Sequence, residues 1–136
     1  QLERALSKDD ILSLYLTLAP YGGNLEGIRA ASFAYFGKEP RRLTLGETAL
    51  LVALPQSPEY RRPDRHPERA RAARNRVLDR ISGNGIFSAQ ELEAAKAEPV
   101  PSARKSMPLV APHAADDARA AFSDRSIIKL TIRARL

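Results

Sequence analysis

SKDDILSLYLTLAPYGGNLEGIRAASFAYFGK, residues 7–38, predicts two helices joined by a tight corner at residues 20–23. Ser7 is followed three residues later by Asp10, a pattern typical of a helix start at which each side chain caps the backbone N–H of the other residue. Apolar side chains then cover most of the helix circumference. Such a helix is usually buried, so we expect Lys8 at the edge of buried surface, where its charge needs an anion or a path to water.

The second helix of this stretch is expected over residues 24–36, after the glycine corner. Asn24 is the candidate N-cap. Small residues then recur at helical spacing, and they form a strip that lets another helix approach closely: Gly27, Ala31 and Ala34. Gly37 predicts the helix end, and Pro40 prevents the helix from resuming.

The motifs of this stretch also carry a resemblance to a known family. They are Lys8-x-x-Ile11-Leu12-x-x-Tyr15-Leu16, the glycine corner, Gly27-Ile28-x-Ala30-Ala31 and Tyr35-Phe36-Gly37-Lys38. Together they resemble the second half of the family 51 peptidoglycan glycosyltransferase domain of class A penicillin-binding proteins. The resemblance covers residues 1–81, and more loosely the rest. It implies a mainly α fold, the C-terminal part of a lysozyme-like glycosyltransferase domain.

The resemblance also implies an activity. The family polymerises lipid II into glycan strands: the acceptor 4-hydroxyl attacks the donor anomeric carbon, and undecaprenyl pyrophosphate leaves. The family's general-base glutamate lies upstream of the region that this chain covers, and Glu3 and Glu26 are weak substitutes. We therefore expect no catalytic residue in this chain and no activity of the chain alone. The full enzyme would use a divalent cation, Mg or Mn, and would act at the periplasmic face of the bacterial inner membrane.

Three side chains are the candidate substrate-binding residues. Lys8 matches the family's motif lysine, which implies a position near the donor phosphates. Tyr15 belongs to the same motif, although a core position is the alternative for this side chain. Arg74, in Arg74-x-x-Val77-Leu78, resembles the family's last motif, and a structural ion pair is the alternative there. Thr17 stands where the family commonly has Asn, which puts any amide contact in doubt.

The basic character of the chain comes from one segment. Residues 61–80 hold eight arginines and three acidic residues, a net charge of +5 out of a total of +6. Arg74 lies within the apolar stripe of the predicted helix over residues 67–81, so it needs a carboxylate or phosphate partner, whereas the other seven arginines can be solvated. The alternative function is a non-catalytic basic helical module that binds anionic membrane or nucleic acid. No aromatic residue is interleaved with these arginines, which argues against nucleic acid.

Further elements follow along the chain. Capping boxes predict helices that begin at Thr44 and Ser88, and the helix of the apolar residues 49–54 is expected at the centre of the core. A weak helix over residues 114–122 and a short C-terminal β-strand over residues 127–133 complete the prediction. We divide the chain into the glycosyltransferase part, residues 1–98, and a linker, residues 99–136, that leads towards a transpeptidase domain absent here.

Several classes of site are excluded or disfavoured by the sequence. There is no cysteine and there are only two histidines, so we expect no metal site in this chain. Two Ser-x-x-Lys matches, at Ser102 and Ser126, lack a Lys-Thr-Gly partner and predict no penicillin-reactive serine. The longest apolar run, residues 49–54, is far shorter than the roughly 20 residues of a membrane span. The absence of a signal peptide and the start at Gln1 suggest a trimmed chain. Such a lobe would expose apolar faces, so we expect a partner chain or dimerisation to cover them.

Overall fold

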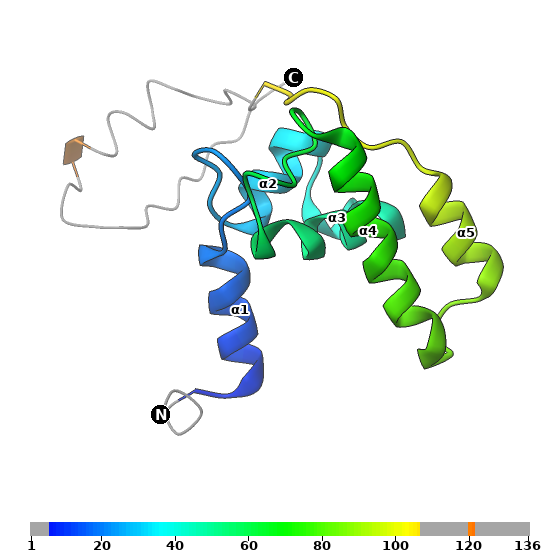
Figure 1. Cartoon of the computed structure of the whole chain (residues 1–136). Coiled ribbons are helices and arrows are strands. Elements are labelled where there is room, and N and C mark those ends of the chain that lie inside the picture. Colours follow the sequence, from blue (N-terminus) through cyan, green and yellow to red (C-terminus); the bar gives the residue numbers. More distant parts are fainter. Residues whose placement is uncertain (1–5, 107–119, 122–136) are drawn as a thin grey trace, which may run out of the picture. The chain divides into compact units, whose positions relative to one another are not determined.

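The computed structural model describes residues 6–106 and 120–121. In this part the chain is mainly α-helical, as predicted (Figure 1). The helices are α1 (Lys8–Leu18), α2 (Ile28–Phe36), α3 (Leu45–Ala53), α4 (Pro67–Ile81) and α5 (Ala89–Ala97), with short 3-10 segments η2 (Pro40–Arg42), η3 (Leu54–Gln56) and η4 (Ser82–Asn84). The described residues 6–106 belong to one compact unit. The predicted helix over 114–122 lies almost entirely outside the described residues, and the predicted strand over 127–133 lies wholly outside them.

Side chains fix the start of most of these helices, as the sequence predicts. In each of α1, α3 and α5 the N-cap side chain accepts a hydrogen bond from the backbone three residues on, and the acid at that position binds back to the cap. The three pairs are Ser7 with Asp10, Thr44 with Glu47, and Ser88 with Glu91. Pro67 occupies the first turn of α4, where its missing N–H leaves no helical hydrogen bond unmade.

The predicted start of α2 at Asn24 is wrong, because the helix begins at Ile28 with Gly27 as its N-cap. The preceding backbone is already used in a small loop: the Leu25 N–H donates to the Gly22 carbonyl, and the Gly27 N–H donates to the Ala19 carbonyl. Gly27 has a φ of +84°, and a Cβ there would lie 2.7 Å from the Thr17 carbonyl oxygen. Glycine is therefore required at this start. The predicted end at Gly37 is confirmed.

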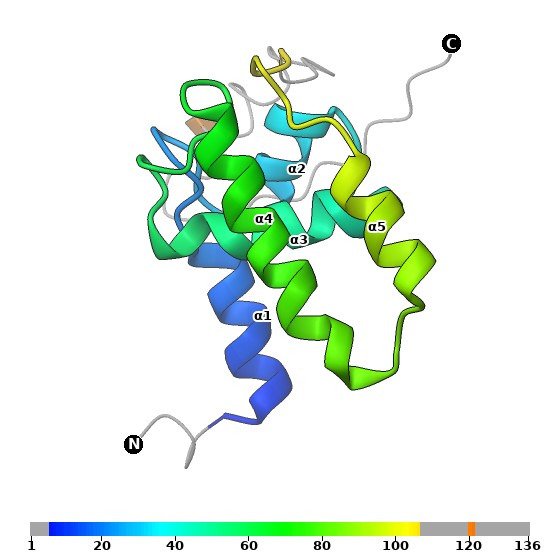
Figure 2. The ribbon, with the colours of Figure 1, turned by 45° about the vertical axis from the view of Figure 1, so that its right-hand side comes forward.

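Helix α3 lies at the centre of the unit, as predicted, and packs against α2, α4 and α5 (Figures 1 and 2). On the α2 side, Leu50, Leu51 and Leu54 contact the small-residue strip of α2 in one buried cluster. On the other side a second cluster joins α3 to α4 and α5: Ala49, Leu78, Leu92 and Ala95. Residues 99–106 also pack with this unit, so they are part of the folded body rather than free of it.

The expectation that α1 is buried is wrong. No residue of α1 is buried, and the side chains of Leu12, Tyr15 and Leu18 are 55%, 52% and 54% exposed. The physical reason is that α1 meets the body mainly through α2 and extends away from α3, α4 and α5 (Figure 1). Most of the apolar side chains of α1 therefore lie on the surface of the protein. None of the helices in the described part of the chain is long and apolar enough to cross a membrane.

Candidate functional site

The exposed apolar surface of α1 is the first feature of the candidate site. We call it the α1 face and define it by Ile11, Leu14, Tyr15 and Leu18, which line a hollow of about 360 Å³ together with Ala19 and Pro20. The hollow is open and carries almost no polar surface. Large exposed apolar patches on a folded protein usually mark a binding surface. The α1 face is thus suited to an apolar ligand or to another protein segment.

Lys8 extends the α1 face at its N-terminal end. At 100° and 1.5 Å per residue, Lys8 lies nearly in line with Tyr15 and about 10 Å from it along the helix axis. Its side chain is exposed, and none of the ion pairs among the described residues includes it. The hydrogen bonds from Ser7 lower the pKa of Asp10, so that this carboxylate is committed to capping the helix. Lys8 is therefore free to meet an anion.

Arg74, the third predicted residue, has a different environment. It is buried with 1% exposure, as its place in the apolar stripe of α4 predicts. Its Nη1 and Nη2 each donate over 2.5 Å, to the carbonyl oxygens of Glu98 and Lys96, and its Nε donates to Asn75. The expected carboxylate or phosphate partner is therefore replaced by carbonyl oxygens at the C-terminal end of α5, where the helix dipole is negative. Burial lowers the pKa of this guanidinium.

The three predicted residues do not form one cluster. Lys8 and Tyr15 share a side of α1, while the partners of Arg74 lie at the end of α5, on the other side of the body in both views (Figures 1 and 2). The structure thus brings together two of the three. Its geometry favours the structural alternative for Arg74, and the role of all three in substrate binding stays a prediction.

A second arginine of the basic segment is buried, contrary to the expectation that seven of the eight are solvated. Arg62 is 8% exposed, and its Nη2 lies 2.6 Å from Asp64. That contact raises the pKa of Arg62 and lowers the pKa of Asp64. Glu59 also binds Arg62 and accepts a hydrogen bond from the Gly23 N–H. The ion pairs at the glycine corner escaped the sequence analysis, although the Arg–Pro–Asp order of residues 62–64 was a local signal for them.

The aromatic residues beside the corner are part of the same structure. The Tyr35 hydroxyl donates to the Tyr21 carbonyl oxygen over 2.8 Å, and both rings are almost fully buried. Burial raises the pKa of Tyr21 to about 12 and also raises the pKa of Tyr35. Both phenols therefore stay neutral at physiological pH and serve the fold rather than acid–base chemistry. Within the described residues, no group of three or more His, Cys, Asp or Glu side chains could hold a metal ion.

Comparison with known proteins agrees with this architecture. The Transglycosylase family model matches residues 1–82. The chain is 52% identical over 112 residues to penicillin-binding protein 1C of Escherichia coli, which covers 82% of this chain and 14% of that protein. It is 43% identical to penicillin-binding protein 1A of Vibrio cholerae, over 91% of this chain and 15% of that protein. The chain thus spans about one seventh of the length of these relatives.

A solved structure shows the same arrangement of helices. Penicillin-binding protein 1A from Haemophilus influenzae matches with a TM-score of 0.69 and 31% identity, over 90% of this chain and 18% of that one. The resemblance carried by the motifs of residues 7–38 is confirmed. This chain belongs to the transglycosylase family found in penicillin-binding proteins.

Proposed function

We propose that this chain is the C-terminal part of a glycosyltransferase domain that polymerises lipid II into glycan strands of the cell wall. The α1 face is the observation that carries the proposal. Helix α1 is apolar around most of its circumference, yet none of its residues is buried. Lys8 at its start is exposed and forms no ion pair with another described residue. Such a helix is suited to contact something other than its own fold. In a glycosyltransferase domain, the preceding half of the domain and the lipid-linked donor meet that need.

In this proposal, Lys8 acts electrostatically. The leaving group of the reaction is a pyrophosphate, whose negative charge grows as the glycosidic bond breaks. Once the lipid-linked donor covers this end of the apolar surface, water is partly excluded around Lys8, so its charge stabilises the pyrophosphate more strongly than it would in open water. Tyr15, two turns further along the same side, supplies ring surface to the substrate. Arg74 contributes by holding α5 against α4.

The chain alone is proposed to be inactive. Family resemblance assigns the general base to a glutamate upstream of this region. Glu26 pairs with Pro20 through its backbone and has an exposed side chain, so we assign it the role of an ordinary surface acid. The divalent cation of the full enzyme is likewise proposed to bind outside this chain. Among the described residues, no group of three or more His, Cys, Asp or Glu side chains could hold a metal ion.

The proposed setting is the periplasmic face of the bacterial inner membrane, where lipid II and the growing glycan strand are partners. The membrane surface is a further proposed partner. The exposed α1 face is proposed to be covered by the preceding half of the domain, with a second copy of the chain as the occupant when that half is absent.

A chimera tests the function. This chain replaces the matching segment of Escherichia coli penicillin-binding protein 1C, and glycan strand formation from lipid II is measured against the unaltered protein. We expect the chimera to polymerise lipid II and the chain alone to form no glycan strands. Lys8→Ala should lower the polymerisation rate of the chimera. A folded chimera without any polymerisation would refute the proposal, because 52% identity predicts compatible packing.

The alternative function, a basic module for anionic membrane or nucleic acid, is weakened by the structure. Of the eight arginines in residues 61–80, three serve the fold: Arg62 and Arg74 as described, and Arg61 through its hydrogen bond to the Ala53 carbonyl oxygen. Competition separates the two functions. A lipid II site is blocked by a phosphoglycolipid mimic of the donor and not by duplex DNA.

A further inference from the structure

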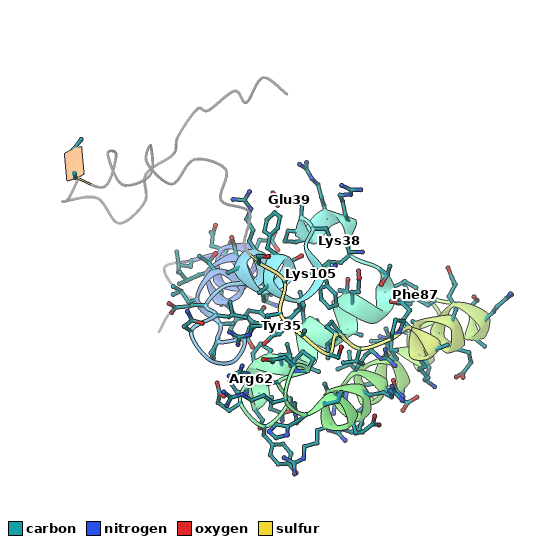
Figure 3. The ribbon with its side chains drawn as sticks, turned by 90° about the horizontal axis from the view of Figure 1, so that it is seen from above. Tyr35, Lys38, Glu39, Arg62, Phe87 and Lys105 are labelled. Carbon is teal, nitrogen blue, oxygen red and sulfur yellow. The ribbon has the colours of Figure 1, made fainter. Side chains whose placement is uncertain are left out.

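The segment that follows α5 returns over the helical body instead of leaving it. Residues 99–105 cross above α2, where Val100 packs against the core cluster and the Lys105 N–H donates to the Ala34 carbonyl oxygen over 2.7 Å. Seen from above, this yellow segment passes Tyr35 and ends at Lys105 (Figure 3). We call residues 99–105 the strap. A backbone hydrogen bond and a buried apolar contact fix its course.

Arg104 is the strap residue that reaches the glycine corner. Its Nη2 donates to the Gly22 carbonyl oxygen over 2.7 Å, and its Nη1 donates to Asn24 Oδ1 over 3.3 Å. Its Nε lies 3.6 Å from an oxygen of Asp64, and its guanidinium lies 5.7 Å from the centre of the Tyr35 ring. One side chain therefore joins the strap to four separate points around the corner, three of them polar.

The corner is held from a second side by the loop after α3. Arg62 and Glu59 contact Gly22 and Gly23, and the space is so tight that a Cβ on Gly22 would lie 2.5 Å from Arg62 Cγ. A Cβ on Gly23 would lie 2.9 Å from Arg104 Nη2. Both glycines have positive φ. Because Gly22 and Gly23 have no side chains, Arg62 and Arg104 can pack directly against the backbone of this turn. Asp64 forms ion pairs with both arginines.

The glycine corner also determines the direction in which α1 extends. Helix α1 has no buried residue, and its main helix contact is with α2. The chain after α1 is fixed by the hydrogen bond from the Gly27 N–H to the Ala19 carbonyl oxygen and by the close approach of Gly27 to Thr17. The direction of the α1 face relative to the body thus depends on the conformation of the glycine corner, where Arg104 binds Gly22 and Asn24.

We propose that Arg104 is a positioning residue for the glycosyltransferase reaction: by clamping the glycine corner, it ties the strap to the α1 face and fixes where Lys8 and Tyr15 meet the donor substrate. The positioning role rests on the proposed function, whereas the clamp itself does not. The strap is then more than the start of a linker, because it is tied to the corner from which the substrate-facing helix extends.

Hydrogen exchange on the chain itself tests the clamp. The reporters are the amides of Tyr21, Leu25 and Gly27, whose hydrogen bonds close the corner. Arg104→Ala should speed their exchange about 10- to 100-fold, the effect of losing charge-assisted hydrogen bonds, while α3 amides keep their rates. Arg104→Lys should fall between, since an ammonium reaches one acceptor and not the full set. Unchanged corner exchange in Arg104→Ala would overturn the clamp.

A matched control and a milder variant keep this test decisive. Arg76→Ala removes an exposed arginine from α4 and should leave the corner amides unaffected. If Arg104→Ala does not fold, then Asn24→Ala, which removes only one acceptor of the clamp, replaces it. Faster exchange confined to the corner in Asn24→Ala supports the clamp, and exchange equal to that of wild type contradicts it.

The chimera with penicillin-binding protein 1C then tests positioning. Arg104→Ala should raise KM for lipid II and lower kcat/KM about tenfold or more, because misplacing a binding group by about 1 Å costs up to ~100-fold. A purely structural role would reduce the amount of folded enzyme and leave KM unchanged. Faster corner exchange with unchanged KM would therefore overturn positioning, while the active wild-type chimera keeps the proposed function. An inactive wild-type chimera would refute the function and the positioning role together, and exchange would still decide the clamp.

Discussion

Replacing Arg74 with alanine is expected to destabilise the helical unit strongly while leaving the α1 face intact. Arg74 is buried, and its two terminal nitrogens satisfy the carbonyl oxygens of Glu98 and Lys96 at the end of α5. Without a donor, each of these part-buried carbonyl oxygens costs up to about 1–3 kcal/mol. Part of that cost is offset, because the variant no longer buries a charge. We expect a net loss of about 3 kcal/mol.

The size of this loss makes it easy to measure. For a folded unit of about 100 residues, 1 kcal/mol corresponds to about 4–8 °C in Tm, so the midpoint should fall by about 12–24 °C. Urea unfolding followed by circular dichroism gives the free energy of unfolding directly. Arg74→Lys should lose less, because it keeps the charge and one donor direction. Arg76→Ala, an exposed arginine on the same helix, is the control and should lie within about 0.5 kcal/mol of wild type.

Two results would refute the reasoning about Arg74. A free energy of unfolding for Arg74→Ala within the range of the Arg76→Ala control would mean that the α5 carbonyls do not depend on this side chain. A stable Arg74 variant whose chimera loses affinity for lipid II would mean that Arg74 contacts the leaving group, the alternative considered from the sequence.

Three further predictions follow from other parts of the structure. Asp64→Asn should flatten the acid side of the stability curve: contact with Arg62 depresses the folded-state pKa of Asp64, so its contribution is present above the unfolded value of about 3.9 and is lost as the pH falls below it. Gly27→Ala should cost about 1–3 kcal/mol in urea unfolding, since it combines a positive φ with a clash against Thr17. Lys8→Ala should leave Tm unchanged and raise KM for lipid II in the chimera, because the side chain is exposed and forms no ion pair with the rest of the described chain.

Each of these has its own control. For the acid titration, Glu68→Gln is the control because it changes an exposed carboxylate on α4. A titration of Asp64→Asn identical to wild type would contradict the ion-pair argument. Gly83→Ala adds a methyl group where nothing lies within 4 Å, so equal losses at Gly83 and Gly27 would contradict the clash. Asp9→Ala changes an exposed neighbour of Lys8 and is the control. A rise in KM equal to that of Lys8→Ala would show that the positive charge of Lys8 has no specific role.

Local patterns predicted the helix boundaries well where a side chain caps its own helix. The capping boxes at Ser7, Thr44 and Ser88 and the glycine end at Gly37 are each made within a few residues, so the sequence contains their whole cause. The start of α2 was missed for the opposite reason. Asn24 has the chemistry of a cap, but its backbone is committed to a loop closed by residues 19–27, and the Arg104 guanidinium holds its side chain.

The candidate site divides in the same way. The motif of residues 8–16 placed Lys8 and Tyr15 on one side of a helix and pointed to the family, because helical spacing and local motifs are properties of the sequence itself. Burial is a property of neighbours. Whether Arg74 finds a phosphate or a helix end was decided by α5, more than 20 residues later in the chain. The burial of Arg62 depends on its packing against Gly22 in the distant glycine corner, although its ion-pair partner Asp64 is local. The hydrogen bond from Arg104 to the Gly22 carbonyl oxygen joins residues 82 positions apart, so it forms only when the strap has folded over α2.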